Sequence, residues 1–193
     1  MENDREKAIK NIPTAFNFII ELYKEVVNLF GEVESFLKKH EFPAAGELGI
    51  VESVSKALNS PDKWLIWHPE RYFLNKNNDT LICIKCMLYD EERQLEKPCV
   101  IAGVYRFKKP VERKLKLLSE WNNILLNDLK TDFDIVNEKN GVSTTQLKNQ
   151  EKILKAWKGY ELHYLKFFEV PLIELTDSKA IKEKICDKLI KIL

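Results

Sequence analysis

The chain has 193 residues, with 31 basic and 30 acidic side chains and a formal net charge of +1. This length suits one domain with a full hydrophobic core, and the balanced charge excludes a whole-molecule attraction to nucleic acid or to anionic membranes. The first ten residues are mostly charged, and no apolar run approaches the roughly 18 residues that span a bilayer. We therefore expect a cytoplasmic protein without a membrane segment.

The segment from residue 13 to about 39 has apolar side chains at helical spacing along two adjacent seams, which together cover roughly 200° of a helix. We expect a helix that Asn11 caps, with Pro13 in its first turn. A helix this broadly apolar has to be covered from two directions, by its own domain or by another chain. The two seams are Phe16, Ile20, Tyr23, Val27, Phe30 and Leu37, and Phe18, Leu22, Val26, Leu29, Val33 and Phe36.

A second helix is predicted from about residue 45 to 58, between a break at Phe42 and Pro43 and a stop at Pro61. Its apolar residues recur on one side, as expected of a helix that packs on a neighbour. The first two helices would then form an N-terminal helical hairpin within residues 1–60.

Residues 61–193 are predicted to form a sheet with a central and a C-terminal helix. Strands are expected at 63–68, 71–75, 80–89 and 99–107, giving an antiparallel meander of two long strands with a shorter one before them, and at 160–170 as a late strand. A helix is predicted at 110–130, and a small hairpin at 134–136 and 142–147 around the turn residues Asn140 and Gly141. Asp177 or Ser178 is expected to cap a terminal helix. The fold class predicted is a single α+β domain with a mostly antiparallel sheet.

Four cysteines are expected to be reduced, buried thiols (Cys83, Cys86, Cys99 and Cys186). Cys83 and Cys86 have the spacing of a zinc or redox pair, but a strand directs residues three apart to opposite faces of its sheet. We therefore predict no metal and no cofactor. The six scattered glycines also lack the clustering of a phosphate-binding loop.

The densest group of aromatic and ionisable residues is at 67–72. Its candidate ligand-binding residues are His68, Glu70 and Arg71, joined by Lys85 and Arg106 on neighbouring predicted strands. The competing interpretation is a strand that leaves the core through Pro69, with its aromatic rings buried and its charges in solvent. No serine-hydrolase or zinc-hydrolase motif occurs, so no catalytic residue is assigned.

Two observations keep a nucleic-acid function open as an alternative. The predicted order of helix, three-strand meander, helix and strand also occurs in restriction-endonuclease-like nucleases, but the residue two before Lys85 is Cys83, where such a metal site needs a carboxylate. Basic residues also crowd the end of a predicted strand and the start of the next helix, at Arg106, Lys108, Lys109, Arg113, Lys114 and Lys116.

The doubly apolar first helix favours a non-enzymatic protein-interaction or regulatory module. Its partner would be a second copy, giving a homodimer, or another protein. The alternative is a ligand- or nucleic-acid-handling protein, including a divergent metal-dependent nuclease. The candidate interaction residues are Leu22, Val26, Leu29, Val33 and Phe36.

Overall fold

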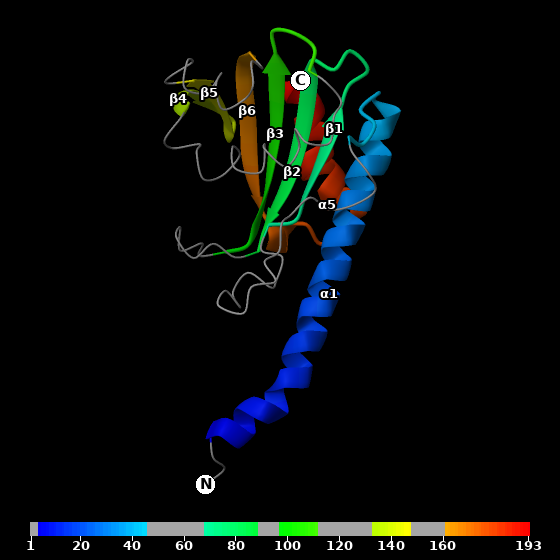
Figure 1. Cartoon of the computed structure of the whole chain (residues 1–193), viewed down its shortest axis with the longest axis vertical. Coiled ribbons are helices and arrows are strands. Elements are labelled where there is room, and N and C mark those ends of the chain that lie inside the picture. The colour runs from blue at the N-terminus through cyan, green and yellow to red at the C-terminus, as the bar shows by residue number, and fades with distance from the viewer. Residues whose placement is uncertain (1–3, 46–67, 89–96, 112–132, 148–160) are drawn as a thin grey trace.

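The computed structural model describes residues 4–45, 68–88, 97–111, 133–147 and 161–193 (Figure 1). These residues form an antiparallel six-stranded sheet with the strand order β1-β2-β3-β6-β5-β4. Its strands are β1 (Glu70–Leu74), β2 (Thr80–Met87), β3 (Cys99–Phe107), β4 (Phe133–Lys139), β5 (Val142–Leu147) and β6 (Leu162–Pro171). The helical elements are α1 (Asp4–Lys39), η2 (Leu172–Glu174), α5 (Ser178–Ile181), η3 (Lys182–Cys186) and α6 (Asp187–Ile192). The predicted α+β class is confirmed.

The sheet follows the predicted pattern closely. The meander β1-β2-β3 and the late strand β6 are present, and β6 pairs with β3. The predicted hairpin is β4-β5, whose turn residues Asn140 and Gly141 have φ angles of 55° and 65°. Such left-handed angles suit the tight turn that joins two antiparallel strands. The N-terminal helical hairpin is not confirmed, because the helix expected at 45–58 lies outside the described residues, as do the strand at 63–68 and most of the helix at 110–130.

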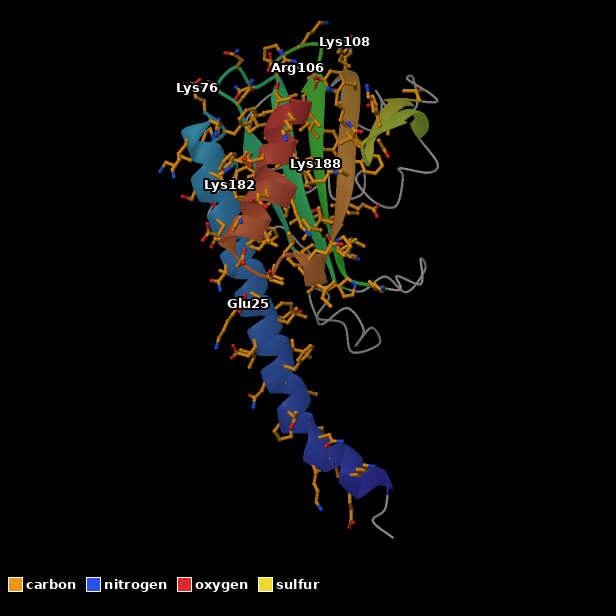
Figure 2. All side chains as sticks on the ribbon, turned by 180° about the vertical axis from the view of Figure 1, so that it is seen from behind. Glu25, Lys76, Arg106, Lys108, Lys182 and Lys188 are labelled. Carbon is orange, nitrogen blue, oxygen red and sulfur yellow. The ribbon has the colours of Figure 1, made fainter. Side chains whose placement is uncertain are left out.

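Side chains that alternate along the strands build a separate hydrophobic cluster on each face of the sheet. In β2, Leu81 and Cys83 belong to one cluster, whereas Ile82 and Cys86 belong to the other. The second cluster also contains side chains of α1 and of the C-terminal helical segment, 178–192. Figure 2 shows these two helical parts side by side on the same face of the sheet.

The C-terminal helical segment is held at both of its ends. Asp177 caps it as predicted, because its side chain accepts a hydrogen bond of 2.8 Å from the backbone N–H of Ala180. At the other end, Lys166 on β6 donates to the carbonyl of Ile192 at 2.8 Å. These contacts fix the segment across the sheet beside α1.

The long helix α1 begins earlier than predicted. It starts at Asp4 instead of near Asn11, so that Pro13 lies inside the helix. An internal proline removes one backbone hydrogen bond and bends a helix without always ending it. Figure 1 shows that the N-terminal end of α1 changes direction relative to the rest.

Only the C-terminal half of α1 is covered from two directions, by the sheet and by the C-terminal helical segment. Val26, Leu29, Phe30, Val33 and Leu37 are buried there. The N-terminal half extends away from the sheet (Figure 1). None of the helices in the described part of the chain combines the length and the apolar character needed to cross a bilayer.

Candidate functional site

The projecting half of α1 exposes several large apolar side chains that the fold of the monomer does not cover. The exposed fractions are 57% for Ile9, 50% for Ile12, 59% for Phe16, 49% for Ile20 and 55% for Val27. At 100° per residue these five side chains lie on one side of the helix. Apolar side chains that line up in this way are typical of a surface that contacts another protein.

This exposed surface continues a stripe that is buried further along the same helix. The stripe starts at Ile9, alternates steps of three and four residues without interruption, and ends at Leu37. Such spacing is the heptad pattern of helices that pack against another helix along their length. The body of the protein covers only the last part of the stripe. The stripe residues are Ile9, Ile12, Phe16, Ile19, Tyr23, Val26, Phe30, Val33 and Leu37.

The predicted interaction residues lie on α1, but most of them are buried by the fold of the monomer itself. Val26, Leu29 and Val33 are buried within the monomer, and Leu22 and Phe36 are half-buried. The exposed residues Ile9 and Ile12 are not among the predicted ones, because both precede Pro13, which lies in the first turn of the predicted helix. The sequence feature that could have found them is the heptad spacing, which runs through Pro13 unchanged.

A groove of about 920 Å³ lies beside the C-terminal half of α1, and its lining includes Val26 and Val27 from the stripe side of the helix. It runs between α1 and the segment that contains η2 and the start of α5, and Leu22, Leu29 and Leu172 line its apolar part. Glu25 and Glu32 also line it. The groove lies beside the covered half of α1, and the projecting half is not apolar on one side alone, because Phe18 is 70% exposed on the side opposite the stripe.

Glu70 and Lys85, two of the predicted ligand-binding residues, form a buried ion pair. They are cross-strand neighbours in β1 and β2, with 3.6 Å between the charged atoms and exposed fractions of 1% and 4%. Tyr72 and Cys83 form the next cross-strand pair on the same face of the sheet. Burial raises the pKa of both Tyr72 and Cys83, and proximity to Glu70 raises them further.

Arg71 lies on the other face of the sheet and contacts α1. Its guanidinium donates two hydrogen bonds to one carboxylate oxygen of Glu34, at 2.8 and 3.2 Å. The expectation that the charges around Pro69 are in solvent is therefore wrong. Glu70 and Arg71 are both buried, because each finds an opposite charge on a neighbouring element. His68 precedes β1 and is partly exposed.

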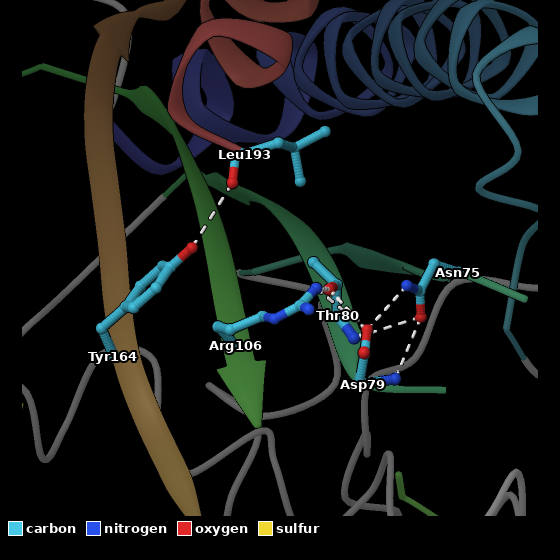
Figure 3. Close-up of polar contacts among 6 residues, drawn as sticks. All are labelled: Asn75, Asp79, Thr80, Arg106, Tyr164 and Leu193. Carbon is cyan, nitrogen blue, oxygen red and sulfur yellow. Dashed lines mark hydrogen bonds and ion pairs between the residues drawn. The ribbon is translucent and has the colours of Figure 1, made fainter. Parts of the chain in front are cut away.

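Arg106 lies at a third location, at the end of the sheet near the β1-β2 turn (Figure 3). It pairs with Asp79 at 3.0 Å and also contacts the hydroxyl of Thr80. Asn75 and Thr80 donate to the same carboxylate at 2.7 and 2.9 Å. Burial would raise the pKa of Asp79, but these hydrogen bonds and the charge of Arg106 outweigh it and lower the pKa.

The structure therefore does not gather the predicted ligand-binding residues into one site. Glu70 and Lys85 share one face of the sheet, Arg71 is on the opposite face, and Arg106 is opposite Thr80, five residues along β2 from Lys85, or about 17 Å. The part of the basic run that is described, Arg106, Lys108 and Lys109, pairs with the local carboxylates Asp79 and Glu161.

The cysteines are free and buried, as predicted. Cys83 and Cys86 point to opposite faces of the sheet, so the two sulfur atoms do not converge on one metal ion. Within residues 4–45, 68–88, 97–111, 133–147 and 161–193, no group of three His, Cys, Asp or Glu side chains is arranged to hold a metal.

Comparison with known proteins does not assign a function. No protein family, no curated protein and no solved structure matches this chain.

Proposed function

We propose that this chain is a protein-association module, in which the projecting half of α1 packs against a helix of a partner. The observation that carries the proposal is the uninterrupted heptad stripe, buried from Val26 onwards and exposed at Ile9, Ile12 and Phe16. A helix that leaves its own domain while keeping the same apolar spacing is suited to packing on a second helix.

The energetics favour a covered helix. Burying the exposed half of one Ile, Val or Phe side chain contributes on the order of 1 kcal/mol, so the five exposed side chains contribute about 5 kcal/mol for each helix covered. Without a partner, the projecting half resembles an isolated helix, which is marginally stable in water at this length and which Pro13 weakens further. A partner helix would bury the exposed apolar side chains and would also stabilise the helical backbone of the projecting half.

Photo-crosslinking tests the proposal. Benzoylphenylalanine placed at Phe16, in the cells that produce the protein, should give one discrete covalent adduct with a protein on irradiation. The matched control places the same group at Glu21, which is exposed on the other side of α1 and should give no comparable adduct. Combining the Phe16 label with Ile12→Asp should abolish the adduct, because a charge inside the stripe is incompatible with a desolvated contact.

The absence of any adduct at Phe16, or equal adducts at Phe16 and Glu21, would contradict the proposed function. The first outcome would mean that the exposed stripe contacts no protein, and the second that it contacts proteins without preference for its apolar side.

A further inference from the structure

We propose that the groove between α1 and residues 172–181 binds a basic amphipathic helix of another protein. The groove is a second surface, separate from the exposed stripe, and its occupant is independent of whatever contacts that stripe. Two observations carry the proposal: the exposed apolar side chains along the groove, and the single sign of the charges around it.

The two most exposed large apolar side chains in the described part of the chain lie along this groove. Ile173 lines it and is 81% exposed, and Phe18, which is 70% exposed, is four residues before Leu22, which also lines it. Residues four apart lie on the same side of a helix, so Phe18 extends the apolar wall of the groove along α1. The groove therefore offers apolar contact area that the monomer leaves in water.

The charged side chains that line the groove are all acidic. Glu25, Glu32 and Asp177 line it, and no lysine, arginine or histidine of the described residues does so. Glu32 accepts a hydrogen bond of 2.9 Å from the hydroxyl of Ser178, and Asp177 accepts one of 2.8 Å from the backbone N–H of Ala180. Both donors are neutral, so they hold the two carboxylates in place without neutralising their charge.

Lysines close to the groove in the sequence are paired with other carboxylates. Lys24 pairs with Glu21 at 2.7 Å, and Lys179 pairs with Glu183 at 3.9 Å. Glu25 makes no ion pair within the described residues, and Figure 2 shows it on α1 near the start of the C-terminal helical segment. A neutral or acidic partner would leave these carboxylates without a cation at the contact, whereas lysine or arginine side chains would pair with them.

The length of the groove suits a helix. The side of α1 that borders it extends from Phe18 to Glu32, or about 21 Å at 1.5 Å per residue. A partner helix of about four turns has the same length. Its apolar side would contact Phe18, Leu22 and Ile173, while basic side chains at its edges would reach the carboxylates.

Fluorescence anisotropy with a synthetic probe tests the proposal on the full chain. The probe is a labelled peptide of leucine and lysine, about 14 residues long, with its leucines on one side of a helix. The chain should bind it with a Kd of about 10 μM or tighter. A matched peptide with glutamate in place of every lysine should bind at least about tenfold more weakly, because the groove carries only acidic charges.

Two pairs of matched variants test whether the peptide occupies the groove. Glu25→Lys should weaken binding by about tenfold, whereas Glu41→Lys, the same charge reversal outside the groove, should change it by less than about twofold. Ile173→Ser should also weaken binding by about tenfold, whereas Val136→Ser on β4 should leave it unchanged. All four positions are exposed, so each variant should fold.

The absence of binding, equal binding of the two peptides, or equal effects within either pair of variants would overturn the proposal. Weaker binding with Ile12→Asp but not with Ile173→Ser would place the peptide on the stripe and would also overturn it. The crosslinking test at Phe16 concerns a different side of α1, so the proposed function and this inference can fail separately.

Discussion

Several charged residues in this protein are paired with opposite charges that are distant in the sequence. Arg71 is bound by Glu34, which is 37 residues away on α1, and Lys85 neutralises Glu70 across two strands. The sequence predicts Glu70, Arg71 and Lys85 as candidate ligand-binding residues, but it does not show which oppositely charged partner each of them finds. Glu70 and Arg71 face opposite sides because neighbouring residues of a strand alternate, but the partner of each depends on strand register and on the packing of α1, which no local pattern around Pro69 encodes.

Asp79 is the single residue whose removal should have the clearest effect near the β1-β2 turn. Asp79→Ala should lower the free energy of unfolding by about 1 to 3 kcal/mol at pH 7, because Asn75, Thr80 and Arg106 each lose an acceptor. The folded-state pKa of Asp79 is lowered, so its contribution is present above the unfolded pKa of about 3.9 and is lost as pH falls through the folded pKa.

Urea denaturation at pH 7 and at pH 3 checks this prediction. The difference between the parent and Asp79→Ala should be smaller at pH 3. The control is Glu174→Ala, which removes an exposed ion pair with Lys184 of 2.6 Å and should change stability by less than about 0.5 kcal/mol. An equal loss at both pH values would show that the Asp79 charge is not what stabilises the turn.

At the scale of elements, α1 shows both what the sequence could predict and what it could not. Its apolar spacing predicted a helix that is covered from two directions, and this is confirmed for the half that contains Val26 and Val33. Its predicted start near Asn11 is wrong, because proline is most favourable in the first turn of a helix, whereas Pro13 lies inside α1. The strands were easier to predict, since runs of β-branched and aromatic residues separated by polar turns indicate their presence and approximate position, although β4 extends from Phe133 to Lys139 where only 134–136 was predicted.

Glu70 on β1 and Lys85 on β2 form a buried ion pair. Substituting one or both residues should show that each charge stabilises the fold only when the other is present. Lys85→Met alone should lower the free energy of unfolding by about 3 to 5 kcal/mol, because it leaves the buried carboxylate of Glu70 without its cation. Combining Lys85→Met with Glu70→Leu should recover most of that loss, since an apolar pair of similar volume suits the neighbouring cluster.

Chemical denaturation of both single variants and of the double variant measures this coupling. Arg71→Met with Glu34→Leu is a matched control at a less deeply buried pair, where Glu34 is partly exposed and the coupling should be smaller. If the double variant Lys85→Met, Glu70→Leu were as unstable as Lys85→Met alone, the pair would not be a simple structural ion pair.

The whole molecule buries all four of its thiols, and this gives it a predictable response to alkaline pH. Burial raises the pKa of Cys86 and of Cys186 to about 12 and that of Cys99 to about 11, and it also raises the pKa of Cys83. In the unfolded chain each thiol has a pKa of about 8.5. The folded protein therefore holds more protons than the unfolded chain above this pH.

The contribution of these thiols to the free energy of unfolding should be constant below about pH 8. Above that pH the free energy of unfolding should fall as the pH rises towards the pKa values of the thiols in the folded protein. Each thiol contributes a loss of about 1.4 kcal/mol for every pH unit above its unfolded pKa. Melting temperatures measured from pH 7 to 10.5 should therefore drop steeply above pH 9. The matched variant Cys186→Ala should show a shallower drop, because one of the four raised pKa values has been removed. A melting temperature that stays constant up to pH 10.5 would contradict the burial of the thiols, since exposed thiols would ionise equally in both states and leave stability unchanged.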